Sequence, residues 1–75
     1  MRAPKITFTL PDGTTVDTQT QRRFVLLGQA TGRPAFIARR SDDPARLRAE
    51  RRGKGFSAGR SYFLADRTAR TLTEI

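Results

Sequence analysis

Hydrophobic and polar residues alternate at the start of the chain. In the segment KITFTL, Ile6, Phe8 and Leu10 alternate with lysine and threonine, and this period of two is typical of a strand with one buried face. The PDGT segment that follows predicts a turn, because Gly13 can adopt a positive φ. TTVDT then predicts a returning strand with Val16 on the inner face. The first part of the chain is therefore predicted to form a β-hairpin.

A second hairpin is predicted over residues 23–40. Phe24 begins an unbroken apolar run that ends at Leu27, and such a run is typical of a central strand covered on both faces. We expect a helix on one face and another element on the other. The turn TGRP leads to AFIAR, where Phe36 and Ile37 are expected to point to opposite faces.

The segment SDDPARLRAERRG, residues 41–53, predicts a short helix. Ser41 or Asp42 is expected to cap its first turn, the Asp-Pro pair that follows suits that turn, and Gly53 is expected to end the helix. Leu47 is the only large apolar side chain in the segment. We therefore expect one residue to anchor the helix and the rest to face solvent.

The chain ends in a third predicted hairpin, made of RSYFLA, the turn DRT and ARTLTEI. Tyr62 and Leu64 are expected on one face and Phe63 on the other, but the pattern does not set the register. The order β-β-β-β-α-β-β predicts an α+β fold with one small, curved antiparallel sheet and one short helix. A partly closed barrel is the alternative, because six short strands can wrap and hide their edges.

The alternation also predicts which side chains are buried. The expected core consists of Ile6, Phe8, Leu10, Val16, Phe24, Leu26, Ile37, Leu47, Tyr62 and Leu64. Four apolar residues are left over, Val25, Leu27, Phe36 and Phe63, and are expected to form a second apolar surface that needs a partner. In a homodimer, Val25, Leu27 and Phe63 would face their copies.

Length and composition limit the protein to one small domain, residues 1–75. The chain has no cysteine and no histidine, so we expect no disulfide, no zinc site and no cofactor. No stretch reaches the roughly 18 apolar residues needed to span a bilayer, and the start lacks a signal-peptide pattern. The sequence therefore predicts a cytoplasmic protein with no membrane partner.

The basic residues are concentrated in the middle of the chain. The net charge is +8. Acids and bases balance in residues 1–21 and 61–75, so the entire excess lies in residues 22–60. A localised basic field attracts polyanions. The alternative explanation for the arginines is compositional. A GC-rich genome encodes many arginines without selection for binding, and those on the helix would then simply form a solvated face.

These residues form the candidate binding site, because arginine forks spaced along a ridge suit phosphates. Phe56, in a loop flanked by glycines, is expected either to stack on an exposed base or to fold into the core. The candidate site for nucleic acid or an acidic partner comprises Arg39, Arg40, Arg46, Arg48, Arg51, Arg52, Lys54, Phe56 and Arg60.

Catalytic residues are hard to find in this sequence. Without histidine or cysteine, the commonest general base and the best thiol nucleophile are missing, and most carboxylates lie where turns and a helix start explain them. Tyr62 with Arg60 and Arg67 offers one arrangement used by small ribonuclease toxins, but a packed strand tyrosine explains Tyr62 better. We therefore expect a non-enzymatic protein.

Two functions fit this sequence. The first is a small basic module that binds DNA or RNA through phosphate contacts from an arginine-rich helix and loop. The alternative is a small phage or mobile-element protein that binds and inhibits a larger host protein machine, as anti-CRISPR proteins do. In that case the arginines would pair with an acidic protein surface.

Overall fold

The computed structural model describes residues 3–53 and 59–75. Its order of elements is the predicted β-β-β-β-α-β-β, so the α+β class is confirmed. The elements are β1 (Ile6–Thr9), β2 (Thr15–Thr18), β3 (Phe24–Ala30), β4 (Phe36–Ser41), α1 (Pro44–Arg52), β5 (Arg60–Asp66) and β6 (Thr71–Glu74).

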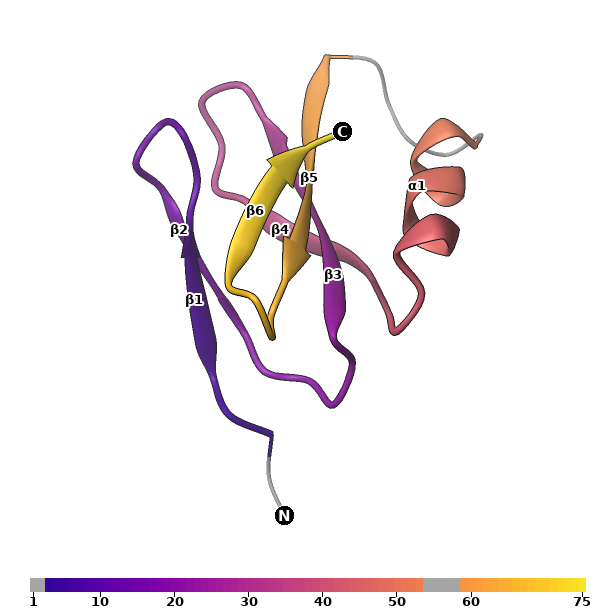
Figure 1. Ribbon diagram of the computed structural model, residues 1–75. Helices are drawn as coiled ribbons and strands as arrows, with labels where there is room; N and C mark the ends of the chain where they lie inside the picture. Colours follow the sequence, from indigo (N-terminus) through magenta and orange to yellow (C-terminus); the bar gives the residue numbers. More distant parts are fainter. Residues whose placement is uncertain (1–2, 54–58) are drawn as a thin grey trace.

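The strands form two separate antiparallel sheets. β1 pairs with β2, while the other four strands form a sheet in the order β4-β3-β5-β6. The predicted single sheet is therefore wrong, and the strands do not close into the alternative barrel. The β1–β2 hairpin lies on one side of the four-stranded sheet and α1 on the other (Figure 1). Three layers result, with β3 and β5 in the middle of the central layer.

The β1–β2 hairpin covers one face of the large sheet with its apolar side chains. Ile6, Phe8 and Leu10 are buried against residues of β3 and β5. We predicted that these residues share a core with Leu26 and Leu64. They instead pack on the opposite face of the sheet, because the hairpin lies on the side of β3 that faces away from α1. Its partners on the sheet are Val25, Leu27, Phe63 and Ala65.

The expected second apolar surface is therefore largely absent. Val25 and Leu27 are fully buried and Phe63 is 4% exposed, so they cannot face a second copy of the chain in the way that we predicted. The hairpin is the second covering element that the apolar run of β3 required. Of the four leftover residues only Phe36 is exposed.

Helix α1 covers the opposite face of the sheet. Leu47 is its one buried residue, as predicted, and it packs in a cluster with Leu26, Tyr62 and Leu64. Leu26 and Leu64 are directly opposite each other on β3 and β5. The helix is thus held to the sheet by a single large side chain and by the polar contacts at its start.

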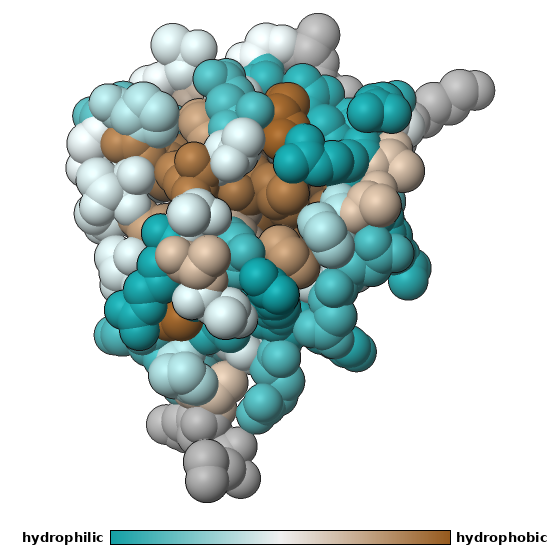
Figure 2. Space-filling view, viewed as in Figure 1, coloured by the Kyte–Doolittle hydropathy of each residue, from teal (hydrophilic) through white to brown (hydrophobic). Residues whose placement is uncertain are grey.

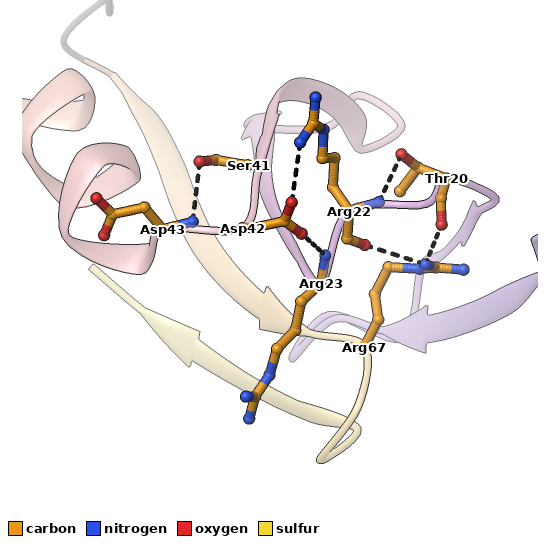
Figure 3. A network of polar contacts seen from close by, with 7 residues as sticks. All are labelled: Thr20, Arg22, Arg23, Ser41, Asp42, Asp43 and Arg67. Carbon is orange, nitrogen blue, oxygen red and sulfur yellow. Dashed lines mark hydrogen bonds and ion pairs between the residues drawn. The ribbon is translucent and has the colours of Figure 1, made fainter.

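The start of α1 differs from the prediction by one or two residues. Asp43 is the N-cap, and its carboxylate accepts a hydrogen bond from the backbone N–H of Ala45 at 3.0 Å. Asp42 is used elsewhere, because its carboxylate accepts from the backbone N–H of Arg23 and from the Arg22 side chain, both at 2.9 Å. Figure 3 shows how Asp42 ties the residues before β3 to the start of the helix.

A β-bulge in the second hairpin decides which side chains of β4 face the helix. Leu26 pairs with Arg39 but Leu27 pairs with Ile37, so Ala38 is the extra residue on β4. Arg39 and Ile37 would share a face in a regular strand. The bulge instead places Arg39 on the face that α1 covers and Ile37 against the β1–β2 hairpin.

Arg67 is a buried arginine that joins the two sheets. It follows β5, is 7% exposed, and points its guanidinium into the chain segment that links β2 to β3. Its Nε donates to Thr18 Oγ1 at 3.0 Å, and its terminal nitrogens donate to the carbonyls of Thr20 and Pro4 and, at 3.1 Å, of Arg22. Figure 3 shows the part of this network around Thr20 and Arg22.

A second polar contact fixes the other end of the hairpin. The side-chain amide of Gln29 on β3 donates to the Asp12 carboxylate at 2.7 Å and to Thr14 Oγ1 at 2.9 Å. The hydroxyl and backbone N–H of Thr14, followed by Gln29, lower the pKa of Asp12. The hairpin is therefore held at both ends by hydrogen bonds and along its length by apolar packing.

We expect Arg67→Ala to lower the free energy of unfolding by about 2–3 kcal/mol, because it removes the donor of the buried Thr18 hydroxyl and of several partly buried carbonyls. Arg67→Lys keeps the charge but not the planar fork, and we expect an intermediate effect. Urea denaturation measures both. Arg33→Ala, an exposed turn residue, is the control, and an Arg67→Ala variant as stable as this control would contradict the role of Arg67.

The Arg23–Asp66 ion pair makes stability depend on pH. Two hydrogen bonds of 3.0 Å join the guanidinium to the carboxylate, which lowers the pKa of Asp66 with help from the backbone N–H groups of Ala69 and Thr68. The stabilisation is present above the ordinary aspartate pKa of about 3.9 and is lost as the pH falls through the lower folded pKa.

We therefore expect Asp66→Asn to lower stability at pH 7 and to make the decrease in stability below pH ~4 shallower. Denaturation curves over the acidic range measure this effect. Glu74→Gln is the control, because Glu74 is exposed on β6. Parallel pH profiles for wild type and Asp66→Asn would show that the pair does not contribute.

Candidate functional site

Helix α1 divides the predicted arginine patch into two sides. Leu47 points to the sheet, and the side chains on either side of it lie toward different strands. Arg46 lies toward β4, where it shares a hollow with Arg39 and Arg40. Arg48 lies toward β6, where it lines hollows together with residues of that strand. The patch is thus two surfaces rather than one.

The surface on the β4 side is partly neutralised. Glu50 Oε2 lies 3.7 Å from Arg39 Nε, and Glu50 Oε1 lies 3.6 Å from Arg46 Nε. Arg22 joins this surface from the segment before β3 and pairs with Asp42 at 2.9 Å. Together with Arg40 and Ser41, these side chains line a hollow of about 450 Å³. We call this surface the β4 cluster; its basic members are Arg22, Arg39, Arg40 and Arg46.

The arginines on the β6 side of α1 differ from the β4 cluster in their partners. Arg48, Arg51 and Arg52 line a hollow of about 380 Å³ together with Ile75. Among the residues that the structure describes, none of these three arginines forms an ion pair. The positive charge of the two exposed members, Arg48 and Arg52, is therefore directed at solvent.

Arg51 is the most strongly positioned of the three. Its guanidinium carbon lies 4.6 Å from the centre of the Tyr62 ring, a distance typical of a cation–π contact. Its Nε is buried and has no hydrogen-bond partner within the described part of the chain. The Tyr62 ring therefore restrains the Arg51 guanidinium, although the Nε–H of that guanidinium has no acceptor among the described residues.

A second hollow of about 390 Å³ adjoins the first and shares Arg48 with it. Its walls are the start of α1 and strands β5 and β6; the remaining lining residues are Phe24, Pro44, Ala45, Leu64, Asp66, Thr71 and Thr73. We call the two hollows together the α1–β6 groove. In Figure 2, viewed as in Figure 1, apolar surface lies over the middle of the molecule between the β1–β2 hairpin and α1, and hydrophilic groups border it.

Arg60 lies outside the groove and contacts Phe36 instead. The Arg60 guanidinium carbon lies 5.4 Å from the centre of the Phe36 ring, and Phe36 is 38% exposed. The ring lies across Gly28, where an added Cβ would come within 2.6 Å of it and within 2.9 Å of Tyr62. The absence of a side chain at Gly28 thus makes room for the Phe36 and Tyr62 rings.

Seven of the nine predicted site residues can be placed, and Lys54 and Phe56 lie outside the described residues. The structure groups Arg39, Arg40 and Arg46 on one side of α1 and the other three helix arginines on the opposite side. The prediction missed the groove residues Phe24, Leu64, Thr71, Thr73 and Ile75. No sequence signal indicated them, because their position beside α1 depends on how β6 pairs with β5.

The structure also places the residues of the ribonuclease-like alternative. Tyr62 is 2% exposed, as expected of a packed strand tyrosine. Arg67 binds backbone carbonyls near the β1–β2 hairpin and is not directed at Tyr62. In the described part of the chain no three acidic residues lie together in a way that could hold a metal ion. The one helix described there is too short and too polar to cross a membrane.

We expect Gly28→Ala to lower the free energy of unfolding by about 1–3 kcal/mol, because the new methyl group overlaps two aromatic rings. Adding Phe36→Ala removes the closest of these overlaps and should restore much of the stability. Thermal unfolding of the two single variants and the double variant measures this coupling. Strictly additive effects would contradict the packing of Phe36 on Gly28.

Comparisons of the chain with models of protein families, with curated proteins and with solved structures found no match. No relative therefore suggests an activity for the chain. The features that bear on function are its own: the β4 cluster, most of whose arginines pair with an acid, and the α1–β6 groove, whose three helix arginines form no ion pair with a described residue.

Proposed function

We propose that the protein is a small, non-enzymatic nucleic-acid-binding module whose arginines contact phosphates. The observation that supports this proposal best is the set of three helix arginines without a carboxylate partner in the described structure, Arg48, Arg51 and Arg52. Three cations held on one side of a single helix repel one another, and a polyanion relieves that repulsion while releasing its own counterions.

The β4 cluster adds a second set of phosphate contacts in this proposal. Arg40 is exposed and forms no ion pair among the described residues. Arg46 lies 3.6 Å from Glu50, and because exposed pairs of this kind contribute little energy, Arg46 can turn to a phosphate at small cost. Arg39 is held more firmly, because it pairs with Glu50 at 3.7 Å and also donates to the Ala38 carbonyl at 2.7 Å.

The alternative, an inhibitor that binds an acidic surface of a host protein machine, has a weaker physical basis. It rested in part on spare apolar residues on the sheet, and the β1–β2 hairpin covers three of them, Val25, Leu27 and Phe63. The arginines alone do not separate an acidic protein from a nucleic acid. The phosphate proposal needs no exposed apolar sheet, and we therefore favour it.

We expect the protein to bind single-stranded and duplex oligonucleotides in low salt and to bind them much more weakly as salt increases. Arg48→Ala with Arg52→Ala should weaken binding and make the slope of log K against log salt shallower by roughly 0.7–0.9 for each phosphate that is no longer neutralised. Fluorescence anisotropy at several salt concentrations measures both quantities. Arg51 is left intact because its contact with Tyr62 serves the fold.

The matched control is Arg33→Ala with Arg70→Gln, which also removes two positive charges, at exposed positions outside both surfaces. We expect the control to bind nearly as wild type does. Absence of binding in low salt, or binding that salt does not change, would rule out the proposal.

A further inference from the structure

The α1–β6 groove is polarised along its length. Arg48, Arg51 and Arg52 surround one end. Asp66 lies at the other end, where Arg23 already pairs with it. An anionic group is therefore favoured at the arginine end and disfavoured beside Asp66. A ligand that fits the whole groove needs a charged part and a part without negative charge.

The arginine end suits a phosphate group better than a carboxylate. A single arginine fork satisfies a carboxylate, whereas a phosphate in a nucleic acid presents oxygens in several directions. Three guanidinium groups around one hollow match that arrangement. Arg51 is already restrained against the Tyr62 ring at 4.6 Å, so it gives up less side-chain freedom when it binds.

The adjoining hollow suits the flat, uncharged part of a nucleotide. Phe24 and Leu64 provide apolar surface, while Thr71 and Thr73 provide hydroxyl groups along β6. A nucleobase has apolar faces and a hydrogen-bonding edge. The volume of this hollow, about 390 Å³, lies in the range of ordinary ligand pockets. Arg48 lines both hollows, so phosphate and base sites lie next to each other.

We infer that the α1–β6 groove binds one nucleotide of a single-stranded nucleic acid, with its phosphate among Arg48, Arg51 and Arg52 and its base against Leu64 and Thr73. This inference rests on the proposed function and narrows it. A base that is stacked and paired within a duplex cannot enter a hollow in the protein unless it is flipped out, which costs energy. The groove therefore selects single strands over duplexes.

The test uses a single-stranded oligonucleotide, its duplex, and a strand of the same length in which abasic sites replace the bases. Arg48→Ala removes a phosphate contact, and Thr73→Phe fills the base hollow from an exposed position. The matched controls are Arg33→Ala, at an exposed turn outside both arginine surfaces, and Thr15→Phe, at an exposed position of β2. Thermal unfolding confirms that each variant is folded.

We expect wild type to bind the single strand more tightly than the duplex. Arg48→Ala and Thr73→Phe should each weaken single-strand binding by roughly tenfold, and the controls by less than roughly threefold. Thr73→Phe should not weaken binding of the abasic strand, because no base is present to displace.

Other outcomes overturn the inference in distinguishable ways. Equal or tighter binding of the duplex, or a Thr73→Phe variant that behaves as Thr15→Phe does, refutes the groove site but leaves nucleic-acid binding intact. If no oligonucleotide binds in low salt and a polyglutamate peptide does, both the groove site and the proposed function are wrong.

Discussion

The arrangement of the layers depends on Arg67. A guanidinium has five N–H donors in one plane, and here they are directed at Thr18 Oγ1 and at backbone carbonyls of Pro4, Thr20 and Arg22. Those acceptors come from the chain on either side of the β1–β2 hairpin, whereas Arg67 itself follows β5. The Thr18 hydroxyl completes the link by donating to the Ile6 carbonyl at 2.8 Å. One side chain thus satisfies a buried group of carbonyls that have no strand partner.

This link lets a small domain without disulfides bury both faces of its main sheet. The hairpin shares no strand pairing with that sheet in the described structure, so only side chains hold the two together. Apolar packing of Phe8 and Leu10 on Val25 and Leu27 supplies the area, and Arg67 and Gln29 fix the position at the two ends. Because apolar packing is non-directional, the polar contacts determine where the hairpin lies.

The opposite face is covered less completely, and the groove is a consequence. α1 is nine residues long and buries a single large apolar side chain, Leu47, so it cannot cover a four-stranded sheet. It lies over β3, β4 and β5 and leaves a groove along β6. Glu50 neutralises the side of α1 that faces β4, and in the described structure no acid does so on the side that faces β6. Incomplete coverage and uneven charge therefore occur at the same place.

The sequence by itself determined the local elements. Alternation and turn residues predicted all three hairpins, the φ of +90° at Gly13 agrees with its expected turn role, and the single apolar side chain of the helix identified Leu47 as its anchor. These features depend on neighbouring residues only. The concentration of basic residues in the middle of the chain was equally plain from the sequence.

The tertiary structure decided which surfaces meet. Alternation shows that Val25 and Leu26 point in opposite directions, but not which element covers each. We therefore expected the β1–β2 hairpin to pack against Leu26, whereas it packs against Val25. The bulge at Ala38, the burial of Arg67 and the position of β6 beside α1 all depend on contacts between distant segments. The division of the arginine patch into two sides follows from those contacts. The sequence shows that the arginines are close along the chain, but only the fold decides which of them lie beside Glu50 and which lie beside β6.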